Sequence, residues 1–324
     1  MPNMLKYPLK FEPILKEKIW GGQKLNALLN KDSNLPNIGE SWEISDVDGD
    51  ISIVSNGALK GKTLKELLES YKAELLGEKN YKIFGNKFPL LIKFIDAKED
   101  LSIQLHPNDA LAAKRHDSFG KTEMWYVMQA DEKANLIVGF NQEMTLDKYK
   151  SHLEAKKLTE ILNYEDVEEG DVFFIDGGRI HAIGAGVMLA EIQQTSDITY
   201  RVYDWDRVDA QGNQRDLHID LALEALDFNM KDDFRVSYPK KENQTNKMLQ
   251  CPYFISNYLE ITDTVKKENT VDSFIIYMCV SGEAIIESEQ FSEVIKKGET
   301  VLLPAGIKTY QITSKNARVL EVYV

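Results

Sequence analysis

Cysteine is nearly absent from this chain. Only Cys251 and Cys279 occur among 324 residues, which is too few for a disulfide framework. The two are also too far apart in the sequence for a zinc ribbon. We predict that both are thiols packed in the core. A closed structural zinc site, which normally uses thiolates, is therefore not expected.

Long hydrophobic runs and an excess of basic residues are missing as well. No stretch reaches membrane-spanning length, and residues 1–6 are not followed by an apolar run of signal-peptide length. We expect a cytosolic protein. The formal net charge of −13 argues against nucleic acid or an anionic membrane as the main partner. A phosphorylated small substrate would need local lysine or arginine at its site to reverse this charge.

Helical periodicity is rare, and strand-like patterns dominate. Apolar residues at helical spacing occur in only three segments, residues 62–76, 145–162 and 217–225. Short β-rich runs bounded by Gly, Asp, Asn or Pro occur at residues 88–95, 124–128, 172–175, 187–192, 274–280 and 301–303. The pattern predicts a mainly β protein, a barrel or sandwich with peripheral helices.

A candidate metal site begins with Gln104 and His106, which stand two residues apart in an apolar run ended by proline. Strand alternation would point both side chains to one face. Glu123 opens the next strand, where an unpaired inward carboxylate would be costly. His181 lies between two glycine pairs, where the backbone can approach other groups closely. These four donors suit a borderline divalent cation such as zinc, with a position left for water or substrate.

The alternative for each histidine is an ordinary core or surface residue, and the other histidines serve as controls. His116 lies in a charged run, His152 in a predicted helix, and His218 close to acidic residues. We expect all three to be solvated. For Glu123, the alternative is surface exposure at the start of its strand.

A degenerate repeat relates two parts of the chain. Residues 169–181 can be laid over residues 297–309 so that glycines, acidic residues and apolar runs coincide. Each copy is typical of a turn, a buried strand and a second turn, as in a duplicated β-barrel domain. The alignment sets His181 against Thr309 and Glu123 against Ser273, so we expect no metal in the second copy. The alternative is a chance match of a common turn.

Several motifs, in the same order along most of the chain, resemble the type I mannose-6-phosphate isomerases, in particular their shorter bacterial form. In chain order these are residues 19–22 (IWGG), 39–43 (GESWE), 88–93 (FPLLIK), 101–109 (LSIQLHPND), 121–123 (KTE), 178–182 (GRIHA) and 197–205 (DITYRVYDW). One departure is Gly120, where some longer relatives carry a histidine. A ring-opening role of that histidine therefore does not carry over to this chain.

The resemblance implies a fold, a metal site and a reaction. The fold would be two cupin-like (jelly-roll) β-barrels with peripheral helices. Residues 1–240 would form the metal-binding catalytic domain with helical insertions, and residues 241–324 a degenerate C-terminal cupin-like domain. The reaction would interconvert mannose 6-phosphate and fructose 6-phosphate through a cis-enediol, without a redox cofactor. The ligands of the single metal ion would be the residues named above, Gln104, His106, Glu123 and His181.

Catalytic and substrate-binding groups are less sharply defined. The resemblance gives Arg201 a catalytic role. Asp197, Lys121, Glu43 and a metal-bound water are all chemically able to move the proton, and the sequence does not rank them. Lys93 and Lys121 answer the need for local positive charge at the phosphate, with Ser102 as a neutral donor. A lysine at position 93 inside an apolar run suggests an inward side chain, with snorkelling to the surface as the alternative.

Two other classes of function stay open at this point. A cupin-like barrel with two histidines and a carboxylate is also suited to an iron-dependent oxygenase, and a metal-free relative to a sugar-binding regulator. Against the regulator, all four ligand positions and Arg201 are occupied by suitable residues. The isomerase is the favoured interpretation, and the sequence leaves the oligomeric state open.

Overall fold

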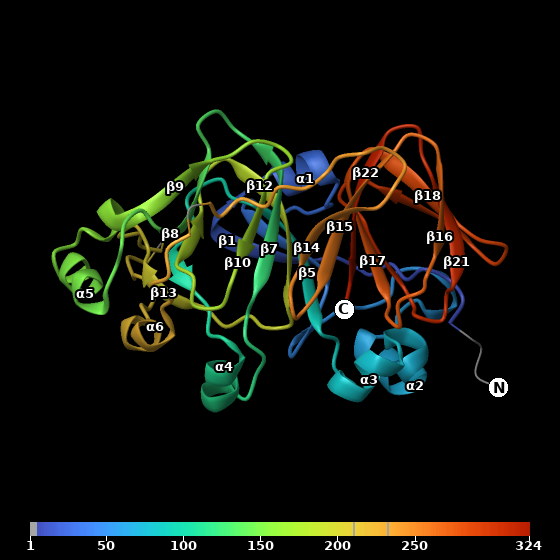
Figure 1. The fold of residues 1–324 in the computed structure, drawn as a ribbon, viewed down its shortest axis with the longest axis horizontal. Coiled ribbons are helices and arrows are strands. Elements are labelled where there is room, and N and C mark those ends of the chain that lie inside the picture. Colours follow the sequence, from blue (N-terminus) through green and yellow to red (C-terminus); the bar gives the residue numbers. More distant parts are fainter. Residues whose placement is uncertain (1–4, 210, 232) are drawn as a thin grey trace.

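Two β sandwiches lie side by side in the computed structural model, with helices at the periphery (Figure 1). The structure describes residues 5–209, 211–231 and 233–324. Residues 1–4, part of the N-terminal segment in which the sequence predicts no leader, lie outside the described residues. Within the described part of the chain, no helix combines the length and the apolar character needed to span a membrane.

The first sandwich packs a six-stranded antiparallel sheet against a five-stranded one. The strand order of the larger sheet is β1 (Ile14–Gly22), β2 (Ile38–Ile44), β5 (Leu90–Asp96), β12 (Val187–Gln194), β7 (Glu123–Ala130) and β10 (Val172–Ile175). The order of the smaller sheet is β13 (Tyr200–Tyr203), β6 (Ile103–Leu105), β11 (His181–Ile183), β8 (Asn135–Phe140) and β9 (Leu162–Asp166).

The second sandwich is smaller and has the same plan. Its five-stranded sheet has the order β14 (Asn246–Gln250), β15 (Ile255–Ile261), β22 (Ala317–Tyr323), β17 (Ile275–Ser281) and β20 (Thr300–Leu303). Its four-stranded sheet has the order β16 (Thr264–Glu268), β21 (Thr309–Thr313), β18 (Glu283–Glu287) and β19 (Ser292–Lys296). A separate small hairpin joins β3 (Asp46–Val47) to β4 (Asp50–Ile51).

The prediction of a mainly β protein is confirmed, but closed barrels are not found. In the described residues, the hydrogen-bonded ladders end at edge strands in every sheet. The two sheets of each sandwich are held together by the side chains between them. All six predicted strand segments overlap observed strands, namely β5, β7, β10, β12, β17 and β20.

The helices lie outside the sheets. They are α1 (Lys24–Leu29), α2 (Leu64–Leu76), α3 (Glu78–Phe84), α4 (Asp109–His116), α5 (Leu146–Glu154) and α6 (Ile219–Ala225), with 3-10 turns at Gly57–Leu59 and Leu158–Ile161. The predicted helices 62–76 and 217–225 correspond to α2 and α6. The helix predicted over 145–162 is shorter in the structure: α5 ends at Glu154, and the 3-10 turn at Leu158–Ile161 leads into strand β9. The short helices α1, α3 and α4 were not predicted.

Helix α2 shows how local sequence sets an element boundary. Thr63 accepts a hydrogen bond from the backbone of Glu66, whose carboxylate accepts one from the backbone of Thr63 in return. This capping box satisfies N–H groups that have no partner inside the helix. The element is kinked at Lys72, with buried leucines at positions 64, 67 and 68 before the kink and at positions 75 and 76 after it.

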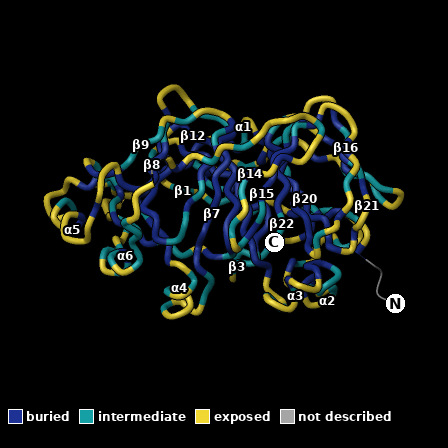
Figure 2. The backbone as a smooth tube through the Cα atoms, in the orientation of Figure 1, coloured by how far each residue is buried: buried dark blue, intermediate teal, exposed yellow. Residues whose placement is uncertain are grey.

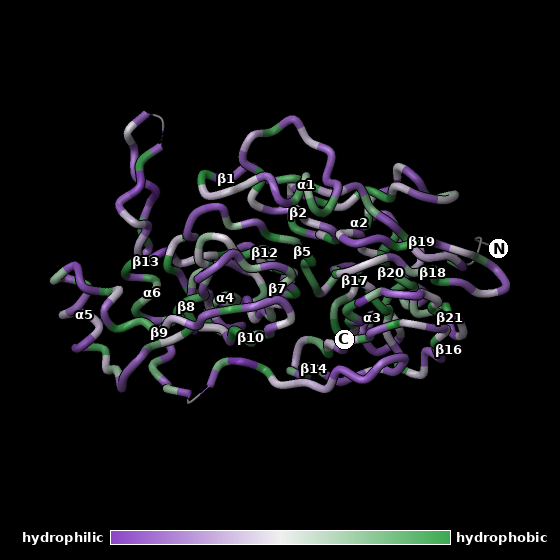
Figure 3. Tube along the Cα trace, turned by 90° about the horizontal axis from the view of Figure 1, so that it is seen from above, coloured by the Kyte–Doolittle hydropathy of each residue, from purple (hydrophilic) through white to green (hydrophobic). Residues whose placement is uncertain are grey.

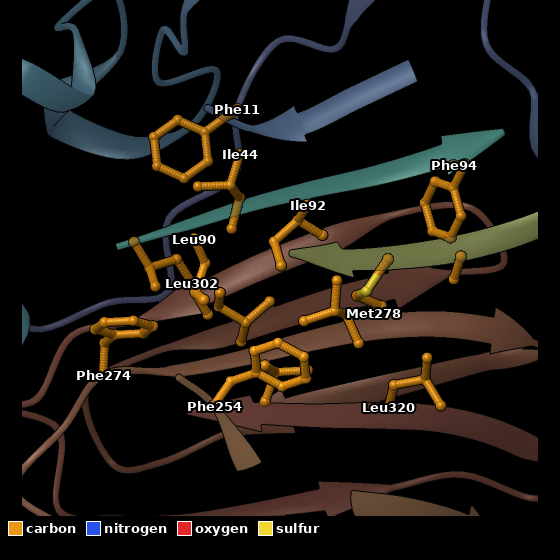
Figure 4. Packing of buried hydrophobic residues seen from close by; sticks show 14 of the residues in the cluster. Phe11, Ile44, Leu90, Ile92, Phe94, Phe254, Phe274, Met278, Leu302 and Leu320 are labelled. Carbon is orange, nitrogen blue, oxygen red and sulfur yellow. The ribbon is translucent and has the colours of Figure 1, made fainter. Parts of the chain in front are cut away.

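The larger sheets of the two sandwiches pack against each other. In Figure 4, Ile92 and Phe94 of β5 face Met278 and Leu320 of the second sandwich. Every residue of β5 is buried, because its other face lines the interior of the first sandwich. Figure 2 shows this burial along the central strands, with exposure concentrated on peripheral helices and loops. The apolar run around Lys93 is therefore a strand buried on both faces.

Hydropathy follows the same arrangement. Viewed from above, the strands between the two sandwiches contain many hydrophobic residues, while the segment that projects beyond β13 is largely hydrophilic (Figure 3). The N-terminal segment crosses to the second sandwich, where Leu9 forms an antiparallel bridge with Leu302 through backbone hydrogen bonds of 2.8 and 2.9 Å. This bridge covers the edge strand β20.

The ladders give the register of the internal repeat. Val172 pairs with Tyr126 in the first sandwich as Thr300 pairs with Met278 in the second. By the same ladders Glu123 pairs with Ile175, and Ile275 pairs with Leu303. The counterpart of Glu123 is therefore Ile275, and the predicted match with Ser273 is wrong by two residues. A shift by two leaves the inward face of a strand unchanged, so the apolar pattern did not reveal it.

The facing sheets correct the second predicted match. The ring of His181 lies 5.3 Å from that of Trp125, and the ring of Tyr310 lies 6.2 Å from that of Tyr277, the counterpart of Trp125 in the β7 and β17 ladders. Tyr310 is buried, whereas Thr309 is exposed. The inward counterpart of His181 is therefore Tyr310 rather than Thr309.

Candidate metal centre

Three predicted ligands converge inside the first sandwich. His106 follows β6, Glu123 begins β7, and His181 begins β11. The Nε2 atoms of His106 and His181 each lie 3.5 Å from a different oxygen of the Glu123 carboxylate. One ligand atom from each residue lies within 4.8 Å of the others, and all three side chains are buried.

The backbone around Gly178 holds both imidazoles in place. Gly178 has a positive φ of 88°, and a Cβ there would lie 2.4 Å from the carbonyl oxygen of Ala225. Its N–H donates to the carbonyl of His106 at 2.7 Å, which ties the turn before β11 to the end of β6. Glycine is required at this position because no side chain fits.

The orientation of the imidazoles directs one nitrogen of each ring toward the Glu123 carboxylate. Nδ1 of His106 lies 2.8 Å from the carbonyl oxygen of Ile198, and Nδ1 of His181 lies 2.8 Å from that of Arg179. Such backbone partners fix the tautomer in which Nε2 carries the lone pair. Both Nε2 atoms are thereby directed toward Glu123.

An unpaired atom and the pKa values fit a cation. His181 Nε2 is buried and has no hydrogen-bond partner in the described residues, a costly state that coordination would relieve. Burial lowers the pKa of His181 to about 4, and burial and the Lys121 ammonium lower that of His106 well below its ordinary value. Burial also raises the pKa of Glu123. Neutral imidazoles beside a carboxylate are the donor set that zinc-type cations bind.

Gln104 and Lys121 border this cluster. Gln104 shares the β6–β11 ladder with His181, and its Oε1 accepts a hydrogen bond of 3.1 Å from Ser102. The Lys121 ammonium lies 3.1 Å from His106 Nε2 and 3.2 Å from Glu123 Oε2. Lys121 thus contacts two of the three clustered residues directly.

A cavity of about 290 Å³ opens above the cluster. Its lining includes Gln104 and His181 together with six cationic and four acidic side chains. The cations are Lys16, Lys18, Lys93, Lys121, Arg201 and Arg215, and the acids are Glu40, Asp50, Glu191 and Asp197. The positive excess meets the requirement for local cations in a chain whose net charge is −13.

Known proteins are similar to this chain along most of its length. Residues 9–152 match the family model "Phosphomannose isomerase type I, catalytic domain", and residues 244–324 match "Mannose-6-phosphate isomerase, cupin domain". The mannose-6-phosphate isomerase ManA of Bacillus subtilis is 34% identical over 95% of this chain and 96% of its own length. The chain belongs to the type I mannose-6-phosphate isomerase family. A mannose-6-phosphate isomerase of Streptococcus mutans is also 34% identical, over 94% of each chain.

Solved structures agree with this family assignment. The crystal structure of the mannose 6-phosphate isomerase from Bacillus subtilis matches with a TM-score of 0.89 at 31% identity, covering 98% of this chain and 100% of that one. A variant of the phosphomannose isomerase from Salmonella typhimurium has the same fold, with a TM-score of 0.78 at 17% identity over 98% and 99% of the two chains. The resemblance found in the sequence motifs is confirmed.

In this member of the mannose-6-phosphate isomerase family, Arg201 lies on β13 at the wall of the cavity. Its Nε donates to Ser102 Oγ at 3.3 Å, and its NH1 donates to the carbonyl of Asp216 at 2.9 Å. Arg207 and Arg215 both pair with Asp204, whereas Arg201 forms no ion pair with any carboxylate that the structure describes. The positive charge of Arg201 is therefore not neutralised by a direct ion pair.

Asp197 and Lys93 occupy opposite parts of the same cavity. Asp197 is exposed on the loop after β12, at the rim. Lys93 is 5% exposed on the floor, and its ammonium lies 3.1 Å from Glu191 Oε1. The inward orientation expected for Lys93 is confirmed, and its charge is balanced by Glu191.

Sequence reasoning missed Glu191 and its partner Trp125. Trp125 Nε1 donates to Glu191 Oε2 at 2.9 Å, and both residues line the cavity. Burial alone would raise the pKa of Glu191, but the ammonium groups of Lys93 and Lys121 lower it to about 2. A signal was present: a glutamate in the apolar run 187–192 is as unusual as the lysine at position 93.

Glu43 does not belong to this site. It pairs with Lys31 and accepts a hydrogen bond from Ser41 Oγ on the reverse face of β2, whereas Glu40 and Trp42 line the cavity. Alternation along the strand points Glu43 away from the site. The candidate role of Glu43 in proton transfer is therefore wrong.

The control residues behave in different ways. His116 is exposed, as expected, and its Nε2 lies 2.7 Å from the hydroxyl of Tyr200. His152 and His218 are only partly exposed, and His218 Nδ1 accepts a hydrogen bond from the backbone of Arg201. Cys279 is buried, as expected for a core thiol, whereas Cys251 is only half-buried.

Proposed function

We propose that this protein is a metal-dependent aldose–ketose isomerase that interconverts mannose 6-phosphate and fructose 6-phosphate. The observation that carries the proposal is the buried cluster of His106, Glu123 and His181 beneath a net-positive cavity. The relatives at 34% identity are named mannose-6-phosphate isomerases and match nearly the whole chain.

The proposed metal is a single zinc ion. Its ligands would be the two Nε2 atoms, the Glu123 carboxylate and the amide oxygen of Gln104, a nitrogen and oxygen set that leaves room for substrate. As a Lewis acid, such an ion stabilises negative charge that develops on the sugar oxygens O1 and O2. The buried His181 Nε2, which has no hydrogen-bond partner among the described residues, supports the proposal.

In the proposed reaction, a base removes the proton from C2 of the open-chain aldose, and the same proton is returned at C1 after the cis-enediol has formed. Asp197 is the candidate base, because it is exposed at the rim and forms no ion pair in the described structure. Lys121 would donate hydrogen bonds to O1 or O2 from the floor. Arg201, with Ser102 fixing its orientation, would stabilise the enediolate with a charge that no carboxylate offsets.

The phosphate group needs positive charge that is not already balanced. Lys93 and Lys121, the predicted phosphate ligands, contact Glu191 and Glu123. We propose that these lysines and Ser102 bind substrate oxygens deep in the cavity. Arg207 and Arg215 share the single carboxylate of Asp204, and the positive charge left over would supply potential for the phosphate nearer to the rim.

The finer organisation is also a proposal. Residues 1–240 would form one cupin-like unit that holds the metal, and residues 241–324 a second, degenerate unit. The shared strand order of the two larger sheets supports such a duplication. A cytoplasmic location is consistent with the free thiols of Cys251 and Cys279. The net charge of −13 argues against nucleic acid as the partner, and the proposed ligand is a small sugar phosphate.

The test is turnover of mannose 6-phosphate to fructose 6-phosphate by the purified protein, before chelation, after chelation and with zinc restored. We expect activity that disappears on chelation and returns with the metal. Absence of turnover in every metal state would rule out the isomerase.

A further inference from the structure

A second cavity, of about 600 Å³, lies between the two sandwiches. One wall is formed by residues of the N-terminal half and the other by residues within 296–300. The N-terminal lining residues lie within 10–15 and 29–32, together with Glu43 and Ser55. Cavities of this size at the junction of two structural units are common sites for small ligands.

The cavity reaches a buried ion pair. Lys31 and Glu43 are only 5% and 6% exposed, and the Lys31 ammonium lies 2.8 and 2.9 Å from the two carboxylate oxygens of Glu43. Ser41 Oγ donates to the same carboxylate at 2.5 Å. The desolvation cost of a buried pair commonly cancels its electrostatic gain, so stability alone does not explain why this pair is there.

The lining indicates the chemistry of the occupant. Four cations and four carboxylates line the cavity, so it favours neither an anion nor a cation. Donors and acceptors are both present, and Thr300 adds a buried hydroxyl that has no hydrogen-bond partner among the described residues. Phe11 and Leu15 provide an apolar wall. A small neutral molecule with many hydroxyl groups matches both kinds of surface.

This cavity is separate from the metal centre. Glu40 and Trp42 line the metal-site cavity, while Ser41 and Glu43 belong to the reverse face of the same strand, β2. Adjacent residues of a strand point to opposite faces of its sheet. An occupant of the second cavity would therefore not touch the substrate pocket.

We propose that the cavity between the sandwiches binds a neutral polyhydroxylated molecule of the size of a free hexose, recognised by Lys31, Glu43 and Thr300. The inference goes beyond the isomerase function and does not rest on it. It predicts saturable binding of an unphosphorylated sugar at a place that the catalytic groups do not reach.

The experiment measures binding of D-mannose to the full-length protein by saturation-transfer NMR. The key variant is Lys31→Met/Glu43→Leu, which replaces the pair by apolar groups of similar volume and should leave stability nearly unchanged. We expect its affinity for D-mannose to fall by about tenfold or more. The matched control is Lys157→Met/Glu160→Leu, which replaces an exposed ion pair that does not line the cavity. This variant should bind D-mannose with the same affinity as the unmodified protein.

Two further variants keep the test decisive. Arg201→Met disables the substrate pocket, so binding that persists in it belongs to the second cavity. If the double variant fails to fold, Thr300→Val removes only the unpartnered hydroxyl, and Ser55→Phe fills the space; both should weaken D-mannose binding. The proposal is overturned if D-mannose does not bind saturably, if Arg201→Met abolishes binding, or if the cavity variants bind normally. Binding of glycine or inorganic phosphate instead of the sugar, with the same dependence on Lys31 and Glu43, would overturn the ligand class.

Discussion

The two sandwiches place a buried glutamate at the same point of the same strand ladder. Glu191 pairs with Trp125 in the first sandwich, and Glu321 pairs with Tyr277 in the second. Trp125 donates to Glu191 at 2.9 Å, and the hydroxyl of Tyr277 donates to Glu321 at 2.6 Å. The acid and its aromatic donor are thus common to both halves.

The surroundings of the two glutamates differ in the source of positive charge. In the first sandwich it comes from Lys93 on the neighbouring strand, whose counterpart in the second is Asn257. Asn257 donates to Glu321 at 2.9 Å, and the charge comes from Lys267 on the facing sheet, at 2.5 Å. Where the first sandwich has His181, the second has Tyr310, whose hydroxyl lies 2.8 Å from that of Tyr277.

The comparison distinguishes features common to both sandwiches from features found in one of them. Both interiors contain a buried glutamate with an aromatic hydrogen-bond donor and a lysine that balances its charge, although the lysine comes from a different strand in each. The cluster of two imidazoles and a second carboxylate occurs in the first sandwich, and its position in the second contains Ile275 and Tyr310. We therefore expect changes in the first sandwich to affect activity and equivalent changes in the second to affect stability.

The largest expected effect comes from Glu123→Gln. Loss of the carboxylate charge between two histidines should reduce metal content strongly and lower kcat/KM by about a thousandfold or more. Metal analysis and steady-state kinetics would measure this. The matched change in the second sandwich, Ile275→Val, should leave both within about twofold. Equal losses in the two variants would contradict the proposed division of roles.

Arg201→Lys should have the next largest effect. A lysine keeps the charge but loses the planar fork that contacts Ser102 and Asp216, so kcat/KM should fall by about a hundredfold with metal content unchanged. In the second sandwich, Lys267→Arg serves as the control and should leave kcat/KM within about twofold. Unchanged kinetics in Arg201→Lys would remove Arg201 from the proposed mechanism.

Glu321→Ala tests the second sandwich directly. It leaves the largely buried Lys267 without a counter-ion and Tyr277 without an acceptor, so the free energy of unfolding should fall by about 3 kcal/mol. Urea denaturation would measure this loss, and activity per folded molecule should stay within about twofold. Lys267→Met/Glu321→Leu should recover most of the stability. A loss of activity greater than the loss of folded protein would argue that the second sandwich acts in catalysis.

The smallest expected effect links the two halves through Asp272. Its carboxylate, next to the second sandwich, accepts hydrogen bonds of 2.9 and 2.8 Å from the backbone of Glu78 and Lys79 at the start of α3. Asp272→Asn should reduce stability at neutral pH by about 0.5 kcal/mol.

The pH dependence of this difference has a definite sign. The hydrogen bonds from Lys79 and Glu78 hold the pKa of Asp272 below its ordinary value of 3.8. Its stabilising contribution is therefore present above that value and is lost as the pH falls through the lowered pKa. Unfolding of both proteins between pH 7 and pH 3 should show the difference shrinking in acid. A difference that grows in acid would contradict the assignment.

The sequence predicted most of the candidate metal centre, the cluster of His106, Glu123 and His181, because strand alternation and the ordered motifs act locally. Gln104 and His106 flank one position of a strand, and the turn at Gly178 could be recognised from its glycines. Glu191 was missed because its partner Lys93 lies on another strand, and only the ladder between β5 and β12 brings them together.

Other failures have the same physical origin. Glu43 was assigned to the site because the sequence does not say which face of β2 meets the interior of the first sandwich. The upstream match of the repeat was displaced by two residues because almost every position of β7 and β17 is apolar and buried, so the pattern does not fix the register. Helices α3 and α4 were missed because each is short, and neither carries a long apolar stripe.

The bridge between Leu9 and Leu302 has a consequence for how the protein is made. Leu302 is synthesised long after Leu9, so the segment around Leu9 has no strand to pair with until β20 has been made. Until the two segments meet, β20 has an open edge, which is a template for pairing with other chains. Expression of residues 241–324 alone would make that exposure permanent, so a fragment cut at this boundary should aggregate unless the N-terminal segment is supplied.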